Sequence, residues 1–462
     1  MFDIDLAKYG NKVCLITEDQ TYTYNQVEAY CQKLEEKLPP FKSLFLVQAS
    51  TCIDTIIIYL SLLRKGHAFI LDASDNPAFT KVFIKTYNPN FIWTKKEPGL
   101  EYITEFGVHG LIALHSKQLD LHPDLSLMLS TSGSTGSPKL VRLSKKCIYT
   151  NCKSITKYLN ISSDHTTVTN LPLSYSYGLS VLNTHLNKGA SILVTDSSIM
   201  SKDFWELCRT HCVTTLNGVP YNYEIFKRIG LTKMDLPCLR FMTQAGGKLS
   251  QTLVKEFSQW AYEKNIHFFV MYGQTEATAR ISYLPPEKTL DKHSSIGVAI
   301  PGGELSLYSS DHKLITASFT EGELVYKGNN VMLGYATKLA DLAKADELNG
   351  TLYTGDLAQR DEEGYFYITG RLKRFIKLHG NRVNLDEIEH HLKSRSYDVL
   401  CTGLDNTLMI ATLEQDRIDE IKKELIKAFK FHHTTIKVIC LDDYPISHSG
   451  KTQYQELLKA FQ

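Results

Sequence analysis

Residues 130–139 read Ser-Thr-Ser-Gly-Ser-Thr-Gly-Ser-Pro-Lys, a segment built from residue types that bind phosphate. Glycines let backbone N–H groups turn inward, hydroxyls donate hydrogen bonds, and the final lysine adds a positive charge. A solvated surface turn is the alternative for this segment taken alone. The candidate phosphate ligands are Thr131, Ser132, Gly133, Ser134, Thr135, Gly136 and Lys139.

A Walker-type nucleotide loop is a poor match for this segment. That motif has a glycine directly before the lysine, a serine or threonine directly after it, and a helix that continues the chain. Here Ser137 and Pro138 separate Gly136 from Lys139. Proline removes a backbone donor and cannot sit inside a helix, so the sequence argues against a P-loop nucleotidase.

The order Thr-Ser-Gly-Ser-Thr-Gly-Ser-Pro-Lys resembles the phosphate loop of the adenylate-forming (AMP-binding) superfamily, which includes acyl-CoA synthetases, luciferases and peptide-synthetase adenylation domains. Other segments resemble motifs of that superfamily in the same order and extend the resemblance over nearly the whole chain. They are residues 63–72, 270–276, 322–324 with 334–335, 353–357, 370–389 and 445–451. Each motif is short, and their common order carries the resemblance.

The resemblance implies that a carboxylate attacks the α-phosphorus of ATP and expels pyrophosphate, with Mg²⁺ as the metal ion. Residues 131–139 would hold the β- and γ-phosphates. Glu276 would be the Mg²⁺ ligand, because this hard cation prefers carboxylate oxygens. Thr275 would contact an α-phosphate oxygen, and the ring of Tyr272 would face the adenine.

The later motifs imply the remaining roles. Asp356 and Arg371 match two positions that bind ribose, and Lys451 matches a lysine that bridges the substrate carboxylate and the α-phosphate. Lys373 matches a hinge about which the C-terminal domain rotates between two half-reactions. Lys377 matches a lysine near an incoming pantetheine thiol. The expected acceptor is therefore CoA or the phosphopantetheine of an acyl carrier protein.

The acid pocket is harder to read. Tyr175 stands where many members carry histidine, while Ala245, Gly246 and Gly247 match small residues between adenine and acid. Amino-acid-activating members have an aspartate in the segment that contains Tyr175 and usually an asparagine at the position of Val270. Neither is found here. A small plain carboxylic acid is therefore favoured. Transfer to an amine, activation of an amino acid, and a non-catalytic binding module remain alternatives.

Length and charge limit the function classes. A chain of 462 residues exceeds the roughly 250–300 at which one core stops growing, so at least two domains are expected. The net charge of +1 gives no basic field for nucleic acid. The apolar run at residues 56–63 is far below the ~20 residues of a membrane span and predicts a buried helix. Ten scattered cysteines predict free thiols and a cytoplasmic protein.

Apolar runs alternate with longer amphipathic segments in the first 296 residues, which predicts an α/β fold of parallel sheets covered by helices. The predicted strands are 43–47, 67–71, 191–194 and 267–271, and the predicted helices are 203–212 and 249–264.

Dense glycine and short strands at 304–308 and 322–326 then predict an antiparallel, barrel-like portion. Beyond residue 371 the pattern predicts a small α+β domain. Its helices are expected at 385–395 and 416–430, and its strands at 408–413 and 435–441. The resemblance implies the same division: residues 1–371 form a large domain of two doubly wound sheets plus a distorted β-barrel, and residues 372–462 form a mobile lid.

Overall fold

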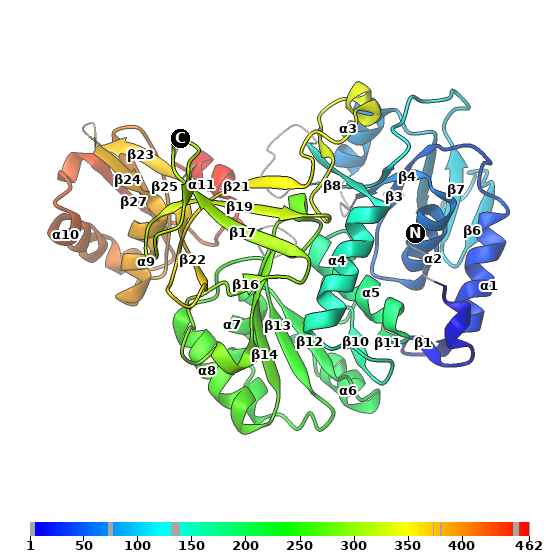
Figure 1. Ribbon diagram of the computed structural model, residues 1–462, viewed down its shortest axis with the longest axis horizontal. Helices are drawn as coiled ribbons and strands as arrows, with labels where there is room; N and C mark the ends of the chain where they lie inside the picture. The colour runs from blue at the N-terminus through cyan, green and yellow to red at the C-terminus, as the bar shows by residue number, and fades with distance from the viewer. Residues whose placement is uncertain are drawn as a thin grey trace. The chain divides into compact units, whose positions relative to one another are not determined.

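A computed structural model describes residues 5–72, 77–130, 139–372, 374–378, 381–446 and 452–461 (Figure 1). The chain divides into two compact units. Unit 1 comprises Met1–Glu304 and Lys327–Leu352, and unit 2 comprises Leu305–Tyr326 and Tyr353–Gln462. The functional boundary expected between residues 371 and 372 stays a prediction. Within the described ranges, no helix combines the length and apolar character that crossing a membrane requires.

The first sheet of unit 1 has eight strands in the order β20-β9-β8-β4-β3-β5-β7-β6. Its centre is parallel: β8, β4, β3 and β5 are neighbours that run in one direction. Antiparallel strands extend both edges. The bounds are β3 Leu44–Gln48, β4 Ala68–Asp72, β5 Phe91–Lys95, β6 Thr104–Phe106, β7 His109–Ala113, β8 Leu125–Ser130, β9 Leu140–Ser144 and β20 Gly334–Ala336.

The second sheet of unit 1 has nine strands in the order β16-β15-β14-β13-β12-β10-β11-β1-β2. The six strands from β14 to β1 in this order are parallel to one another, as the alternating pattern predicted, and antiparallel strands extend both edges. The bounds are β1 Val13–Ile16, β2 Thr21–Thr23, β10 Thr166–Val168, β11 Ser191–Leu193, β12 Thr215–Gly218, β13 Phe241–Gln244, β14 His267–Tyr272, β15 Ser282–Leu284 and β16 Val298–Ala299.

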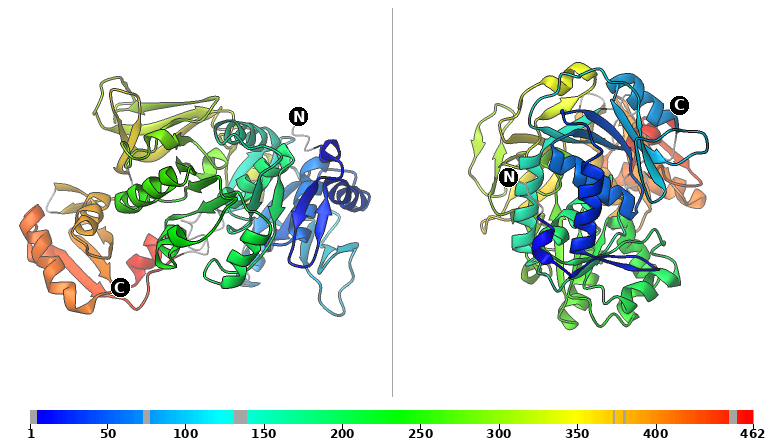
Figure 2. Two further views of the ribbon diagram at one scale, coloured as in Figure 1. Left: turned by 90° about the horizontal axis from the view of Figure 1, so that it is seen from below. Right: turned by 90° about the vertical axis from the view of Figure 1, so that its right-hand side faces the viewer.

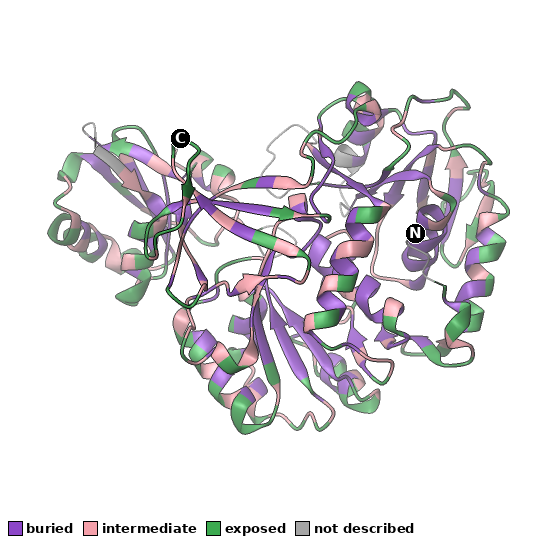
Figure 3. Cartoon of the chain, viewed as in Figure 1, coloured by how far each residue is buried: buried purple, intermediate pink, exposed green. Residues whose placement is uncertain are grey.

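Helices cover both sheets of unit 1, as Figures 1 and 2 show. Their bounds are α1 Tyr24–Glu35, α2 Ile53–Lys65, α3 Pro77–Tyr87, α4 Lys145–Tyr158, α5 Ser176–Lys188, α6 Lys202–Thr210, α7 Pro220–Arg228 and α8 Gln251–Glu263. Side chains of α2, α4 and α5 share one core cluster with strands from both sheets. All residues of α2 from Ile53 to Leu63 are buried, so the prediction of a core helix is confirmed (Figure 3).

Unit 2 contains most of a five-stranded sheet in the order β18-β17-β19-β21-β22, where a barrel-like portion was expected. A two-stranded ribbon (β23-β24) and a three-stranded sheet (β25-β26-β27) follow, and α9 and α10 pack on them through one apolar cluster. The bounds are β17 Gly303–Tyr308, β18 Leu314–Ile315, β19 Gly322–Gly328, β21 Thr351–Arg360, β22 Phe366–Arg371, β23 Phe375–Leu378, β24 Asn381–Asn384, α9 Leu385–Ser394, β25 Val399–Leu404, β26 Thr407–Thr412, α10 Ile418–Phe429, β27 Ile436–Cys440 and α11 Tyr454–Lys459.

The expectation of free thiols throughout the chain is wrong for one pair. Cys212, directly after α6, is joined by a disulfide to Cys238. The other eight cysteines are free, and six of them are buried. Loop residues brought together by the turn from α6 to β12 and the turn before β13 form the bridge, and no sequence pattern marks them as partners.

Candidate active site

The predicted phosphate loop connects two antiparallel strands at one end of the eight-stranded sheet. β8 ends at Ser130 and β9 begins at Leu140, and these two residues are paired across the ladder. The loop residues Thr131 to Gly136 lie outside the described part of the chain, so their predicted role is untested. Lys139, the last residue of the motif, is described, and its ammonium lies over the ring of Tyr335.

Lys139, Tyr335 and Glu276 form a contiguous group. β20 pairs with β9 so that Tyr335 stands opposite Val141, two residues beyond Lys139. The Lys139 Nζ lies 3.3 Å from the centre of the Tyr335 ring, and the Tyr335 hydroxyl donates to Glu276 Oε1 over 2.8 Å. Burial and the nearby Glu276 carboxylate raise the pKa of Tyr335, so its hydroxyl stays protonated and can donate. The ring thus links the predicted phosphate lysine to the predicted Mg²⁺ ligand.

Tyr272 ends β14, and the short 3-10 helix η3 (Thr275–Ala277) follows at once. A side chain at Gly273 would meet the carbonyl oxygen of Ala279 at 2.0 Å, so the turn requires glycine. The turn buries Thr275 and leaves Glu276 half-buried. Tyr272, Thr275 and Glu276, predicted to act together, therefore lie on one tight turn at the carboxyl end of a strand.

Tyr175 and Gly246 are in direct proximity, although 71 residues separate them in the sequence. Tyr175 precedes α5, and Gly246 follows β13 with a φ of +86°. A Cβ on Gly246 would lie 2.4 Å from the Tyr175 hydroxyl oxygen, so a larger residue would displace the ring. Ala245 belongs to the same apolar cluster as Tyr175. The structure therefore brings the predicted acid-pocket residues together.

The turns after β12, β13 and β14 meet at one edge of the nine-stranded sheet. These strands are adjacent and parallel, with Gly218 paired to Gln244 and Gln244 paired to Val270. Their carboxyl ends therefore carry Gly246, Gly247 and Tyr272 to the same edge. Open α/β sheets bind ligands at this edge, so the topology supports a small-molecule site here.

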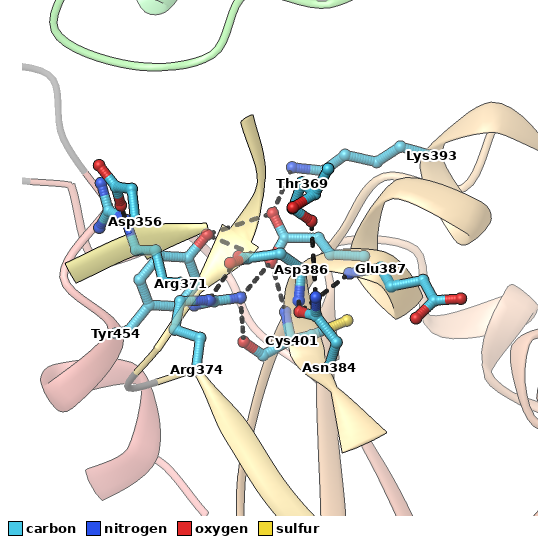
Figure 4. A network of polar contacts seen from close by, with 11 residues as sticks. Asp356, Thr369, Arg371, Arg374, Asn384, Asp386, Glu387, Lys393, Cys401 and Tyr454 are labelled. Atoms are coloured by element: carbon cyan, nitrogen blue, oxygen red, sulfur yellow. Dashed lines mark hydrogen bonds and ion pairs between the residues drawn. The ribbon is translucent and has the colours of Figure 1, made fainter. Parts of the chain in front are cut away.

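In unit 2, Asp356 and Arg371 stand opposite each other on β21 and β22. Arg371 Nε donates to Asp356 Oδ1 over 2.9 Å, as Figure 4 shows. The Asp356 side chain is 4% exposed, whereas that of Arg371 is 59% exposed. The predicted ribose pair is thus formed by cross-strand register, with the carboxylate fixed and the guanidinium accessible.

Lys377 lies on β23, and its side chain is exposed. Its backbone N–H donates to Asp405 Oδ1 over 2.9 Å, which fixes the strand on which the ammonium sits. The predicted hinge Lys373 and the predicted catalytic Lys451 lie outside the described residues. Their roles therefore stay predictions.

A buried ionic network that the sequence did not suggest joins Arg374 to α9 and α11 (Figure 4). Arg374 contacts Asp386 at 2.5 Å and Glu389 at 3.2 Å, both from α9. Its guanidinium carbon also lies 3.5 Å from the ring centre of Tyr454, whose hydroxyl donates to Glu389 over 3.2 Å. Burial raises the pKa of Asp386, and the charge of Arg374 opposes this. The network ties α11 to the segment that follows residue 373.

Two residues of the site in unit 1 also escaped the sequence reasoning. Tyr335 belongs to the Gly-Tyr motif at residues 334–335, for which the sequence suggests no role. Ser176, beside the predicted pocket tyrosine, lies with its hydroxyl 3.4 Å from that of Thr275. Both contacts join residues far apart in the chain, so pattern and spacing alone could not have found them.

Comparison with known proteins decides the family. The profile of the AMP-binding enzyme family matches residues 94–336, more than half of the chain. The chain belongs to the AMP-binding enzyme family. It is 22% identical over 497 aligned positions to the D-alanine--D-alanyl carrier protein ligase of Bacillus cytotoxicus, with 97% of this chain and 96% of that protein covered.

Two further comparisons differ in coverage. The chain is 26% identical over 417 residues to a nonribosomal peptide synthetase of Gibberella zeae, and the match covers 82% of this chain but 5% of that much longer protein. The fold also matches o-succinylbenzoate CoA synthetase from Bacillus subtilis, solved with an acyl-adenylate intermediate. The TM-score is 0.78 at 21% identity, covering 98% of this chain and 97% of that chain. The AMP-binding fold predicted from the motifs is confirmed.

Proposed function

We propose that this AMP-binding enzyme activates a carboxylic acid with ATP and then transfers the acyl group to a thiol. In the first step a carboxylate oxygen bonds to the α-phosphorus, the bond to the β-phosphate breaks, and pyrophosphate leaves. In the second step a thiol of CoA or of a carrier-protein phosphopantetheine displaces AMP. Family membership, together with the grouping of Lys139, Tyr335 and Glu276, is the observation that carries the proposal.

The donor set around Glu276 suits Mg²⁺. One carboxylate oxygen is held by the Tyr335 hydroxyl, and the Thr275 hydroxyl lies on the same turn. Such oxygen donors, completed by phosphate oxygens, are the ligands that Mg²⁺ prefers. The related synthetase from Bacillus subtilis has been solved with ATP and a magnesium ion. When bound, the ion would neutralise phosphate charge, while Glu276 holds its position on the rigid turn.

The other predicted roles extend this arrangement. Lys139 and residues 131–136 would bind the β- and γ-phosphates, and Thr275 an α-phosphate oxygen. The ring of Tyr272 would face the adenine. Asp356 accepts hydrogen bonds and Arg371 donates them, so the pair could grip both ribose hydroxyls. Lys451 would follow the charge that develops between carboxylate and α-phosphate in the transition state.

The second half-reaction would use the C-terminal part of the chain. Rotation about Lys373 would withdraw Lys451 and present Lys377 to the incoming pantetheine, with residues 372–462 acting as the moving lid. Names of relatives support either thiol, since they include the D-alanyl carrier protein ligase and a 2-succinylbenzoate--CoA ligase. Tyr175, Ala245 and Gly246 would line the pocket for the acid. A cytoplasmic location stays a prediction.

Acid-dependent exchange of pyrophosphate into ATP tests the first step. We expect exchange with a subset of small carboxylic acids and its loss in Glu276→Gln, while the exposed-site control Glu287→Gln retains it. Adding CoA, and separately a phosphopantetheinylated carrier protein, then identifies the acceptor. Transfer to amines but to neither thiol would favour the amine-acylating alternative, and preferential exchange with α-amino acids would favour the amino-acid-activating one. A chain that binds no ATP would be a non-catalytic module.

A further inference from the structure

Arg280 is a buried cation held in a fixed place in unit 1. It follows η3 and precedes β15, and the residue is 3% exposed. Its carbonyl oxygen accepts hydrogen bonds from the side-chain amides of Asn151 and Asn330, over 3.1 Å and 3.0 Å. A Cβ on Gly273 would lie 2.8 Å from the Arg280 Cα, so the two turns are packed closely. The backbone that carries the guanidinium is therefore rigid.

The guanidinium of Arg280 has no anionic partner among the described residues. Nη1 donates to the Ala279 carbonyl over 3.1 Å, Nε lies 3.4 Å from Met271 Sδ, and the group stacks 3.9 Å from the ring centre of Tyr177. Two other arginines of unit 1 differ in this respect. Arg142, with a side chain 0% exposed, pairs with Glu347 at 2.6 Å, and Arg64 pairs with two glutamates.

A buried positive charge without an anion is unfavourable, because the protein interior does not replace the hydration that the charge loses. The neighbouring tyrosines cannot neutralise it. Burial raises the pKa of both Tyr175 and Tyr177 to about 12, and the charge of Arg280 only partly opposes this. Both hydroxyls are therefore uncharged near pH 7. Functional sites are where proteins keep an unfavourable buried charge of this kind, because a bound ligand of opposite charge can compensate for it.

Arg280 adjoins the residues predicted to hold the acid. The Tyr177 hydroxyl donates over 2.9 Å to the carbonyl of Thr243, two residues before Ala245. The ring centre of Tyr177 lies 6.3 Å from that of Tyr175. The Tyr175 hydroxyl lies beside Gly246, where an added Cβ would be 2.4 Å from its oxygen. Tyr177 is thus a common neighbour of the guanidinium and of the residues predicted to line the acid pocket.

We propose that Arg280 binds a second carboxylate on the acyl part of the substrate, so that the preferred acid is a dicarboxylate. This inference rests on the proposed function. The reacting carboxylate would face the α-phosphate, and the second one would pair with the guanidinium, whose planar donors match a carboxylate in two parallel hydrogen bonds. Ring stacking on Tyr177 and the fixed backbone orient the guanidinium before the substrate arrives.

Matched acids test this preference. Pyrophosphate exchange is measured with succinate against butyrate, glutarate against valerate, and phthalate against benzoate. The wild type should favour at least one diacid over its partner, and Arg280→Gln should lower kcat/KM for that diacid at least about 30-fold, which is about 2 kcal/mol at 1.36 kcal/mol per tenfold. The monoacid should gain relative to the diacid. Equal losses for both acids of a pair, or a wild-type preference for every monoacid, would overturn the proposal.

A second measurement does not need catalysis. Removing an uncompensated buried charge should raise the unfolding midpoint, so Arg280→Met is expected to be at least as stable as the wild type without ligand. The control Arg142→Met should be less stable, because it breaks an existing ion pair. Diacids should raise the midpoint of the wild type but not of Arg280→Met. A destabilised Arg280→Met with an unchanged response to diacids would contradict the inference.

The two proposals can fail separately. If diacids stabilise the wild type through Arg280 but no acid supports exchange, the proposed adenylation fails and the carboxylate site stands. If monoacids support exchange and diacids neither react nor stabilise, adenylation stands and the role of Arg280 is refuted.

Discussion

Replacing Tyr335 by phenylalanine isolates one hydrogen bond in the candidate metal and phosphate site. The change removes the hydroxyl that donates to Glu276 Oε1 over 2.8 Å and keeps the ring that lies 3.3 Å from Lys139 Nζ. A hydrogen bond to a charged group contributes about 1.5–3 kcal/mol, which corresponds to roughly 10- to 150-fold at 1.36 kcal/mol per tenfold. We therefore expect Tyr335→Phe to lower kcat/KM for exchange by about that factor.

A second variant separates the hydroxyl from the ring. Tyr335→Ala also removes the surface under the lysine ammonium, a contact that contributes about 0.5–2 kcal/mol. It should therefore be several-fold less active than Tyr335→Phe.

The assay is acid-dependent pyrophosphate exchange measured over a series of Mg²⁺ concentrations, with the exposed Tyr262→Phe as the control. Loss of the hydroxyl should raise the Mg²⁺ concentration needed for half-maximal rate, because Glu276 is no longer held in position. Wild-type rate and Mg²⁺ dependence in Tyr335→Phe would refute the reasoning. Equal activity of the phenylalanine and alanine variants would remove the role assigned to the ring.

Three more outcomes are expected. Lys451→Ala should reduce adenylation by orders of magnitude while ATP still binds, measured by exchange beside calorimetric titration with ATP; near-normal exchange would remove the assignment. Lys377→Ala should spare exchange and slow thioester formation, and an equal loss of both steps would argue against a role at the thiol. Burial lowers the pKa of His67 and His185 from 6.5 to about 4, so the unfolded chain binds more protons between these values. The free energy of unfolding should therefore fall as pH drops from about 6.5 to about 4. Chemical denaturation at several pH values should show a smaller fall in the double variant His67→Gln, His185→Gln. An equally steep fall in the double variant would contradict the assignment.

Local elements could be predicted because their signals lie in short stretches of sequence. The apolar run at residues 56–63 lies inside the buried helix α2, and the predicted strand at 267–271 is β14 less its last residue. The turn at 272–276 carries Tyr272, Thr275 and Glu276, which the family resemblance had grouped in one motif. Antiparallel register then explains the Asp356–Arg371 pair, which the motifs named without its geometry.

Contacts between distant segments could not be predicted in this way. The hydrogen bond from Tyr335 to Glu276 spans 59 residues and depends on where β20 joins the sheet. The network of Arg374 and Tyr454 depends on how α11 packs, and the disulfide depends on two turns that approach one another. A single sequence contains the residues of these contacts but no local pattern that shows which distant residues meet in the fold. The unpaired charge of Arg280 likewise becomes visible only once its neighbours are known.

Identifying the nucleotide products tests the central claim most directly. The purified protein is incubated with ATP labelled at the α-phosphate, Mg²⁺ and each acid that supports exchange, and the products are separated before and after CoA or carrier protein is added. We predict labelled acyl-AMP with one equivalent of pyrophosphate, then labelled AMP and an acyl thioester once the thiol is present. Formation of ADP and inorganic phosphate, or cleavage of ATP that does not depend on the acid, would contradict the account.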